Sequence, residues 1–176
     1  ERIAAAIERA RALGVEVLAF PEMALTGYPP EDLLLKPQFI KDNLRTLREV
    51  QRATKGITVI AGFVDRDEFL YNAAAVLHNG ASAYIYHKIL LPNYGVFDEY
   101  RYFRPGCRYP LLTLAGVKIG INICEDIWFS EGPTRSQARA GAELIVNINA
   151  SPYHKQKGRE RLRMLTGRAR RNGVII

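Results

Sequence analysis

The sequence predicts one α/β domain in which helices cover the outer faces of a mixed β-sheet. The chain has 176 residues, of which 48% are hydrophobic, so it can bury one sizeable core. Short apolar runs typical of buried strands alternate with segments whose apolar residues recur at helical spacing. Other strand-like runs are joined in pairs by tight turns, which indicates hairpins within the same fold.

The first third of the chain predicts two helices with a strand between them. Residues 1–14 carry apolar side chains at helical spacing and end on a glycine, which predicts a helix. The following run, VEVLAF, predicts a short buried strand. After the turn-rich stretch TGYPPED, Pro37 can begin a second helix whose apolar stripe extends to the stop at Gly56.

The middle of the chain predicts three strands. The run ITVIAGFV is apolar throughout, as expected of a strand buried on both faces. The runs YNAAAVLH and SAYIYHK are separated by Asn79 and Gly80, a strong turn signal that predicts a hairpin. A long loop, LPNYGVFDEYRYFRPG, follows.

The last third predicts a further strand pair and then alternating helices and strands. PLLTLAG and VKIGINI pair near Gly116, and a helix from Pro133 to Ala140 precedes the buried strand ELIVNIN. A helix from about Gly158 to Asn172 leads into the apolar run VII, which predicts another strand. We therefore expect residues 1–176 to form one domain of a larger chain, lacking its first strand and its C-terminal portion.

Composition narrows the function classes. The net charge of +7 arises between His154 and Asn172, where eight Lys and Arg residues face Glu160 alone. We interpret this segment as a solvated or partner-facing helix flank, because no nucleic-acid motif accompanies it. No apolar run approaches the ~18 residues of a membrane helix, and two cysteines without metal spacing predict free thiols. We expect a soluble, cytoplasmic protein without a metal or cofactor of its own.

The position of Cys124 in the sequence makes it a candidate nucleophile. It ends the strand VKIGINI and precedes Glu125 and Asp126, a sequence suited to a sharp turn beyond the sheet edge. Backbone N–H groups at such a turn can lower a thiol pKa from ~8.5 and face a developing oxyanion. A buried cysteine that serves only as a small core residue is an equally good interpretation. The two adjacent acids oppose thiolate formation, so catalysis would require a nearby cation or base.

Two charged residues also follow strand ends. Glu22 comes directly after VEVLAF, and Lys88 closes SAYIYHK. Alone, Glu22 would more often be a loop acid or helix cap, and Lys88 a solvated lysine. Together with Cys124 they provide the carboxylate, ammonium and thiol needed for amide cleavage through a thioester.

The segments around these residues resemble a known family. FPEMALTGYPPEDLL, YHKILLPNYGVFDEYRYF and GINICEDIW are similar, in order and spacing, to the Glu, Lys and Cys motifs of the nitrilase, or carbon-nitrogen hydrolase, superfamily. More narrowly, they resemble the glutaminase domains of glutamine-dependent NAD synthetases. The resemblance covers nearly the whole chain and implies a nitrilase-like α-β-β-α sandwich.

The resemblance assigns roles to five residues. It implies that Cys124 is the nucleophile, that Glu22 is the general base and acid, and that Lys88 supports the oxyanion together with the backbone N–H of Glu125. Glu99, in FDEY, matches an acidic position that orients the site, although a plain loop carboxylate would otherwise be the interpretation.

Five further residues are implied in substrate binding. Tyr94, Ser151 and Lys157 would hold free glutamine, and Tyr28 and Trp128 would be pocket walls. The alternatives stay open, since both tyrosines could simply pack and Lys157 belongs to the basic cluster. Cys107 has no matching role.

The resemblance also implies partners. Ammonia released from glutamine would pass to a synthetase domain of the same polypeptide, where ATP and Mg²⁺ would support amidation of deamido-NAD to NAD. A homo-oligomer is expected on the same ground. One alternative is a free-standing amidase acting on an omega-amide or carbamoyl compound, and another is a non-catalytic binding or assembly module.

Overall fold

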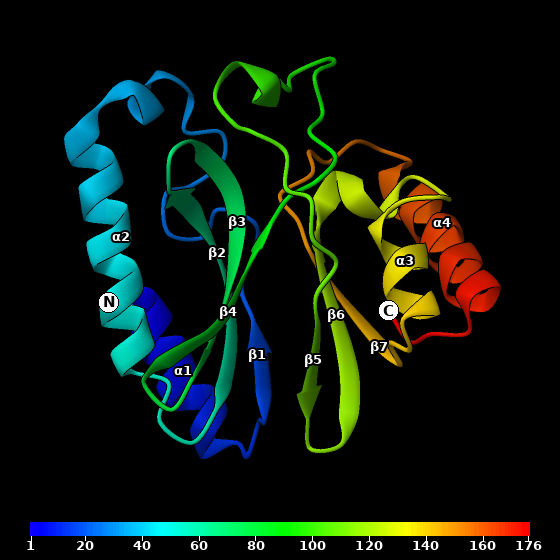
Figure 1. Cartoon of the computed structure of the whole chain (residues 1–176), viewed down its shortest axis with the longest axis horizontal. Helices are drawn as coiled ribbons and strands as arrows, with labels where there is room; N and C mark the ends of the chain where they lie inside the picture. Colours follow the sequence, from blue (N-terminus) through cyan, green and yellow to red (C-terminus); the bar gives the residue numbers. More distant parts are fainter.

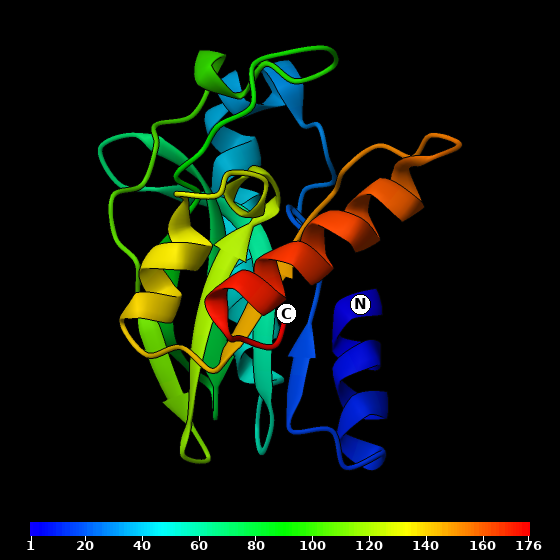
Figure 2. The same ribbon diagram turned by 90° about the vertical axis from the view of Figure 1, so that its right-hand side faces the viewer.

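The computed structural model describes all 176 residues and contains two β-sheets packed face to face between two layers of helices (Figure 1). Helices α1 and α2 lie outside the first sheet, and α3 and α4 lie outside the second, as Figure 2 shows from the side of α3 and α4. The helices span Arg2–Ala12, Pro37–Arg52, Pro133–Arg139 and Lys157–Asn172. None of them is both long and apolar enough to cross a membrane.

The first sheet has the order β1-β2-β3-β4, with strands Val17–Ala19, Thr58–Arg66, Leu70–His78 and Ala81–His87. The crossover through α2 makes β1 and β2 parallel, whereas β2, β3 and β4 are antiparallel neighbours. Asn79 and Gly80 form the β3–β4 turn with positive φ angles of 47° and 77°, as the type of turn predicted from the sequence requires.

The second sheet has the order β5-β6-β7, with strands Leu111–Leu114, Val117–Ile123 and Leu144–Ile148. Strands β5 and β6 form an antiparallel hairpin, and α3 carries the chain across to β7, which pairs parallel to β6. The apolar run at residues 174–176 adds only a single parallel bridge, between Ile175 and Leu144.

Pattern alone predicted one mixed sheet, and this expectation is wrong, because β4 and β5 belong to separate sheets. The sandwich implied by the family resemblance is confirmed. Strands β2 and β3 are apolar on both faces because alternate side chains enter two different cores. One set packs on α1 and α2 and includes Val59, Ala61, Phe63, Ala73, Ala75 and Leu77. The other set packs on the second sheet and includes Ile60, Ala74 and Val76.

Candidate active site

Glu22 is held in a tight loop directly after β1. The loop packs on the backbone of β2 at Gly62, where a Cβ atom would lie only 2.4 Å from the Met23 nitrogen and the Pro21 carbonyl oxygen. A glycine is therefore needed for this close approach. Glu22 is 3% exposed, and its carboxylate accepts a hydrogen bond from the backbone N–H of Ala150 at 2.9 Å.

Lys88 follows β4 and lies fully buried between two carboxylates. Its Nζ donates to Oε1 of Glu22 at 2.7 Å and to Oε1 of Glu99 at 2.8 Å. Burial lowers the pKa of Lys88, but the negative charges of Glu22 and Glu99 outweigh burial and raise this pKa above its ordinary value. Lys88 is therefore a cation at neutral pH.

Glu99 begins a short 3₁₀ turn, Glu99–Arg101, in the loop after β4. Burial raises the pKa of its carboxyl, and the Lys88 ammonium and a 2.8 Å hydrogen bond from the Tyr28 hydroxyl oppose this rise. Glu99 is thus the second carboxylate that accepts from the Lys88 ammonium and helps to fix it in place.

Cys124 lies where β6 runs into the 3₁₀ turn Cys124–Ile127. Its φ angle of +44° is in the left-handed region, which non-glycine residues occupy mainly where the surrounding fold imposes it. Cys124 is 4% exposed, and its Sγ lies 3.4 Å from Oγ of Ser151. The strand-to-turn position predicted from the sequence is confirmed.

The surroundings of Cys124 oppose thiolate formation, and a cation and a carboxylate lie nearby, as the sequence interpretation required of a functional cysteine. Burial and the negative charge of Glu22 raise the pKa of the thiol to about 12, although Lys88 acts in the opposite direction. The turn does not compensate for the loss of water around the sulfur. The resting thiol is therefore protonated, and a base must remove its proton before it can attack.

Cys124 opens onto a pocket of about 290 Å³ that also contains most of the expected binding residues. Its lining includes Tyr94, Glu125, Trp128, Ser151 and Lys157. The Lys157 ammonium lies 4.3 Å from the centre of the Trp128 ring, and the Tyr94 hydroxyl donates to Glu125 at 2.9 Å. Burial and this hydrogen bond raise the pKa of Tyr94 to about 12.

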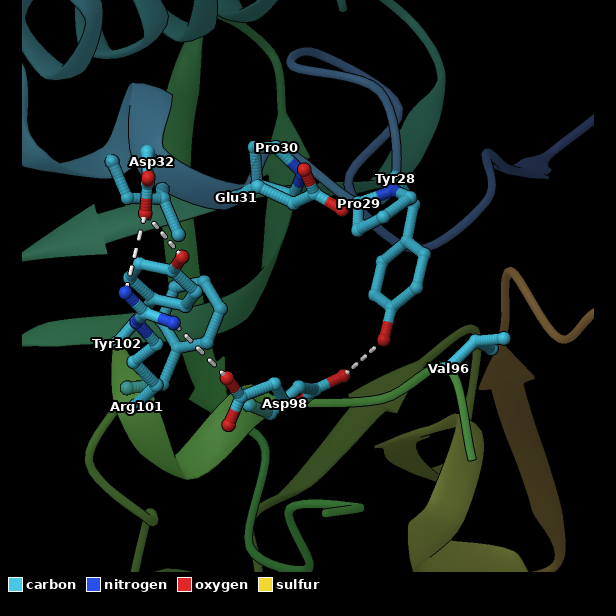
Figure 3. A pocket seen from close by; sticks show the side chains of 12 residues that line it. Tyr28, Pro29, Pro30, Glu31, Asp32, Val96, Asp98, Arg101 and Tyr102 are labelled. Atoms are coloured by element: carbon cyan, nitrogen blue, oxygen red, sulfur yellow. Dashed lines mark hydrogen bonds and ion pairs between the residues drawn. The ribbon is translucent and has the colours of Figure 1, made fainter. Parts of the chain in front are cut away.

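Tyr28 is not a wall of that pocket. Its hydroxyl is bonded to Glu99, and its ring borders a separate pocket of about 230 Å³. Figure 3 shows Tyr28 at one side of this second pocket and Asp32, Arg101 and Tyr102 at the other. The expectation for Tyr28 is therefore corrected, because the loop after β1 turns its hydroxyl toward Glu99.

Asn72 is a site residue that the sequence reasoning missed. It is fully buried in β3, and its Nδ2 donates to Glu22 at 2.7 Å and to Glu99 at 3.3 Å. The available signal was a polar residue directly before the five apolar residues of the run YNAAAVLH. No group of three or more His, Cys, Asp or Glu side chains is arranged to hold a metal ion.

Replacing Asn72 by leucine is expected to lower kcat for amide hydrolysis, the reaction expected from the sequence. Its effect on thermal stability should be smaller than its effect on kcat. Hydrogen bonds to charged groups contribute ~1.5–3 kcal/mol, so loss of the donor shared by Glu22 and Glu99 should reduce kcat about 10- to 100-fold. Asn43→Leu is the matched control, because Asn43 is also buried but bonds only to the backbone of Val64. Equal effects of both variants on kcat and thermal stability would contradict a role for Asn72 in the site.

Comparison with known proteins places this geometry in a family. Residues 1–174 match the carbon-nitrogen hydrolase family. The chain belongs to the carbon-nitrogen hydrolase family. The match covers both sheets and all three strand ends that carry Glu22, Lys88 and Cys124.

Among carbon-nitrogen hydrolase relatives, a glutamine-dependent NAD(+) synthetase from Aquifex aeolicus is 48% identical over 91% of this chain and 29% of its own length. The solved structure of glutamine-dependent NAD+ synthetase from Acinetobacter baumannii has a TM-score of 0.94, with 32% identity over 98% of this chain and 33% of that one. The NitN amidase from Nesterenkonia sp. AN1 has a TM-score of 0.83, with 25% identity over 98% of this chain and 67% of that one. The chain thus spans about a third or less of the synthetases that it matches.

Proposed function

We propose that this domain hydrolyses the side-chain amide of free glutamine through a thioester on Cys124. One observation carries the proposal, namely the buried ion cluster of Glu22, Lys88 and Glu99, whose charges act on the pKa of a thiol that borders a pocket. Burying a lysine with two carboxylates carries a desolvation cost that only close pairing and further hydrogen bonds offset, so stability alone is a weak explanation for this cluster. Because the cluster lies beside a cysteine with a raised pKa, it would provide both a base for the thiol and a cation for the amide carbonyl of a bound substrate.

Glu22 would act as the base that Cys124 requires. As Sγ bonds to the amide carbon, the thiol proton passes to Glu22, which then gives it to the departing nitrogen so that ammonia leaves. Water next attacks the thioester, with Glu22 again taking a proton and returning it to the sulfur as glutamate departs. The hydrogen bonds from Ala150, Asn72 and Lys88 hold the Glu22 carboxylate for both steps.

The oxyanion formed at each attack would be stabilised by the Lys88 ammonium and by the backbone N–H of Glu125. Lys88 keeps its positive charge between Glu22 and Glu99, so it can serve as a fixed electrostatic donor. One such donor contributes about 10²- to 10³-fold to the rate in other hydrolases.

Glutamine suits the charges of the pocket. Its amino and carboxylate groups require one acidic and one basic partner, and the lining offers the Glu125 carboxylate and the Lys157 ammonium. Tyr94 and Ser151 add hydroxyl groups on the same lining. The names of the similar synthetases, which are glutamine-dependent, support the same substrate.

The whole polypeptide would use the ammonia to make NAD. On this proposal, a synthetase domain of the same polypeptide binds ATP and Mg²⁺ and amidates deamido-NAD, as the names of the longer relatives suggest. We also infer a homo-oligomer from the family resemblance, which analytical ultracentrifugation of the full-length protein would test by its mass.

The proposal can be tested by comparing glutamine with a smaller amide in a variant of Lys157. In the full-length protein, Lys157→Met is expected to raise KM for glutamine about tenfold with little change in kcat, because it removes uniform binding of the glutamine carboxylate. Hydrolysis of propionamide, which has no carboxylate, should not change, and Lys155→Met at a neighbouring exposed lysine is the matched control. Preference of the unaltered protein for propionamide over glutamine would favour a free-standing type of amidase instead.

A further inference from the structure

Asp126 is a buried carboxylate that the proposed reaction does not use. It lies two residues after Cys124 and is completely buried. Its two oxygens accept four hydrogen bonds, so the side chain is fully engaged. Oδ1 accepts from the backbone N–H groups of Ile89 at 3.2 Å and Leu90 at 2.8 Å. Oδ2 accepts from the Tyr86 hydroxyl at 2.8 Å and from the backbone N–H of Ile123 at 2.9 Å.

These four donors come from two segments that no backbone hydrogen bond joins directly. Tyr86, Ile89 and Leu90 surround Lys88 at the end of β4 in the first sheet, whereas Ile123 immediately precedes Cys124 in the second sheet. Asp126 is thus a direct connection between the residues that flank the ammonium and the turn that presents the thiol.

We propose that Asp126 is a positioning residue that fixes the Lys88 ammonium relative to the Cys124 thiol across the two sheets. The role of these two groups rests on the proposed function, but the connection itself can be tested without any substrate. Misplacement of a reacting group by about 1 Å can cost ~10²-fold in rate, so a contact that sets this separation affects catalysis strongly.

The contacts require a carboxylate rather than an amide. Each oxygen accepts two donors, and three of the four donors are backbone N–H groups, which cannot reverse direction. An asparagine could keep its oxygen toward Ile89 and Leu90 and turn its NH₂ toward Tyr86, whose hydroxyl can rotate to accept. The N–H of Ile123 would then face a donor, so the end of the connection beside Cys124 would be broken.

The protonation state of Asp126 distinguishes positioning from simple structural support. Burial raises the pKa of this carboxyl to about 6, against the backbone donors, the Tyr86 hydrogen bond and the charge of Lys88. Lys88 and Tyr86 are the titratable groups that act on it across the sheets, and Cys124 and Glu125 are its neighbours along the chain. Because the folded pKa lies above the ordinary value, the contribution of this group to stability falls as pH rises through this range and grows as pH falls. Catalytic activity should instead decrease as the pH falls below about 6, where the Asp126 carboxyl becomes protonated.

The experiment compares Asp126→Asn and Tyr86→Phe with Tyr84→Phe in the full-length protein. Tyr84 lies on the same strand and makes no hydrogen bond to Asp126, so it is the matched control. For each protein we would measure kcat and KM for glutamine, the pH profile of kcat, the thermal midpoint, and the rate at which iodoacetamide alkylates Cys124. Alkylation needs no substrate, and it reports the thiolate fraction that Lys88 supports.

Asp126→Asn is expected to lower kcat about 100-fold with KM within threefold, and to slow alkylation of Cys124. Tyr86→Phe removes a hydrogen bond that lowers the Asp126 pKa, so the acidic limb of its pH profile should move to higher pH, whereas the limb of Tyr84→Phe stays in place. An unchanged limb in Tyr86→Phe, or unchanged alkylation and kcat in folded Asp126→Asn, would overturn the proposal. If the unaltered protein releases no ammonia from glutamine, the proposed function is wrong. The alkylation rates would still decide whether Asp126 positions Lys88 relative to Cys124.

Discussion

Replacing Cys124 by alanine is expected to abolish the release of ammonia from glutamine, with a loss in kcat of about 10⁴-fold or more. Without the sulfur, Glu22 and Lys88 have no nucleophile to activate, and no thioester can form. The fold should persist, because alanine fits the same space and the thiol makes its side-chain hydrogen bond to Ser151 alone. An assay of ammonia release checks the loss of activity, and a thermal unfolding curve of the same variant checks that the fold persists.

The Cys124→Ala variant also separates the two activities proposed for the full-length protein. Synthesis of NAD driven by glutamine should disappear, whereas synthesis from added ammonium salt should continue, because only the source of ammonia has been removed. Cys107→Ala is the matched control, since Cys107 is exposed. Equal loss of both activities in Cys124→Ala would contradict this division of labour.

The individual elements of the fold could be predicted from local pattern. Apolar periodicity, the Asn79-Gly80 turn and the Pro37 helix start all depend on residues close in sequence, and each appears as expected. The division into two sheets could not be predicted this way. An apolar run such as β2 shows that both of its faces are buried, but not whether a helix or another sheet covers each face.

The site shows the same limit. Glu22, Lys88 and Cys124 each follow a strand end, a signal that is local in sequence and weak alone, so they were selected by their combination and by the family resemblance. The partners that hold them could not be selected, since Asn72 is 50 residues from Glu22 and Asp126 is 37 residues from Ile89. The main cause of the raised Cys124 pKa could not be predicted for a related reason. The turn chemistry was visible in the sequence, but the burial that dominates the shift depends on both sheets.

Replacing Lys88 by methionine is expected to cost both activity and stability. The variant retains the volume of the side chain but leaves Glu22 and Glu99 as neighbouring buried carboxylates without a cation. Breaking a buried ion pair by removing one partner typically costs ~3–5 kcal/mol, so unfolding should occur at clearly lower denaturant concentration. Lys118→Met, at an exposed lysine on β6, is the matched control and should unfold as the unaltered protein does.

The pH dependence of stability should differ between the unaltered protein and the Lys88→Met variant. In the unaltered protein, the Lys88 pKa is raised, so its stabilising effect is complete at neutral pH and is lost only as pH rises through that raised value. In Lys88→Met, the Glu99 carboxyl loses the charge that opposes its protonation, so its pKa should rise further. The variant should therefore be weakest at neutral pH and recover stability as pH falls, which denaturant titrations at pH 5 and pH 8 would detect.

A second substitution separates the two roles of Lys88. Adding Glu99→Gln to Lys88→Met removes one of the unpaired charges, so it should restore part of the lost stability. It cannot restore activity, because the cation that would face the oxyanion is still missing. If the double variant were no more stable than Lys88→Met, repulsion between Glu22 and Glu99 would not be the source of the loss. If it regained activity, Lys88 would be needed only to neutralise these carboxylates, and the oxyanion would have to depend on the Glu125 N–H.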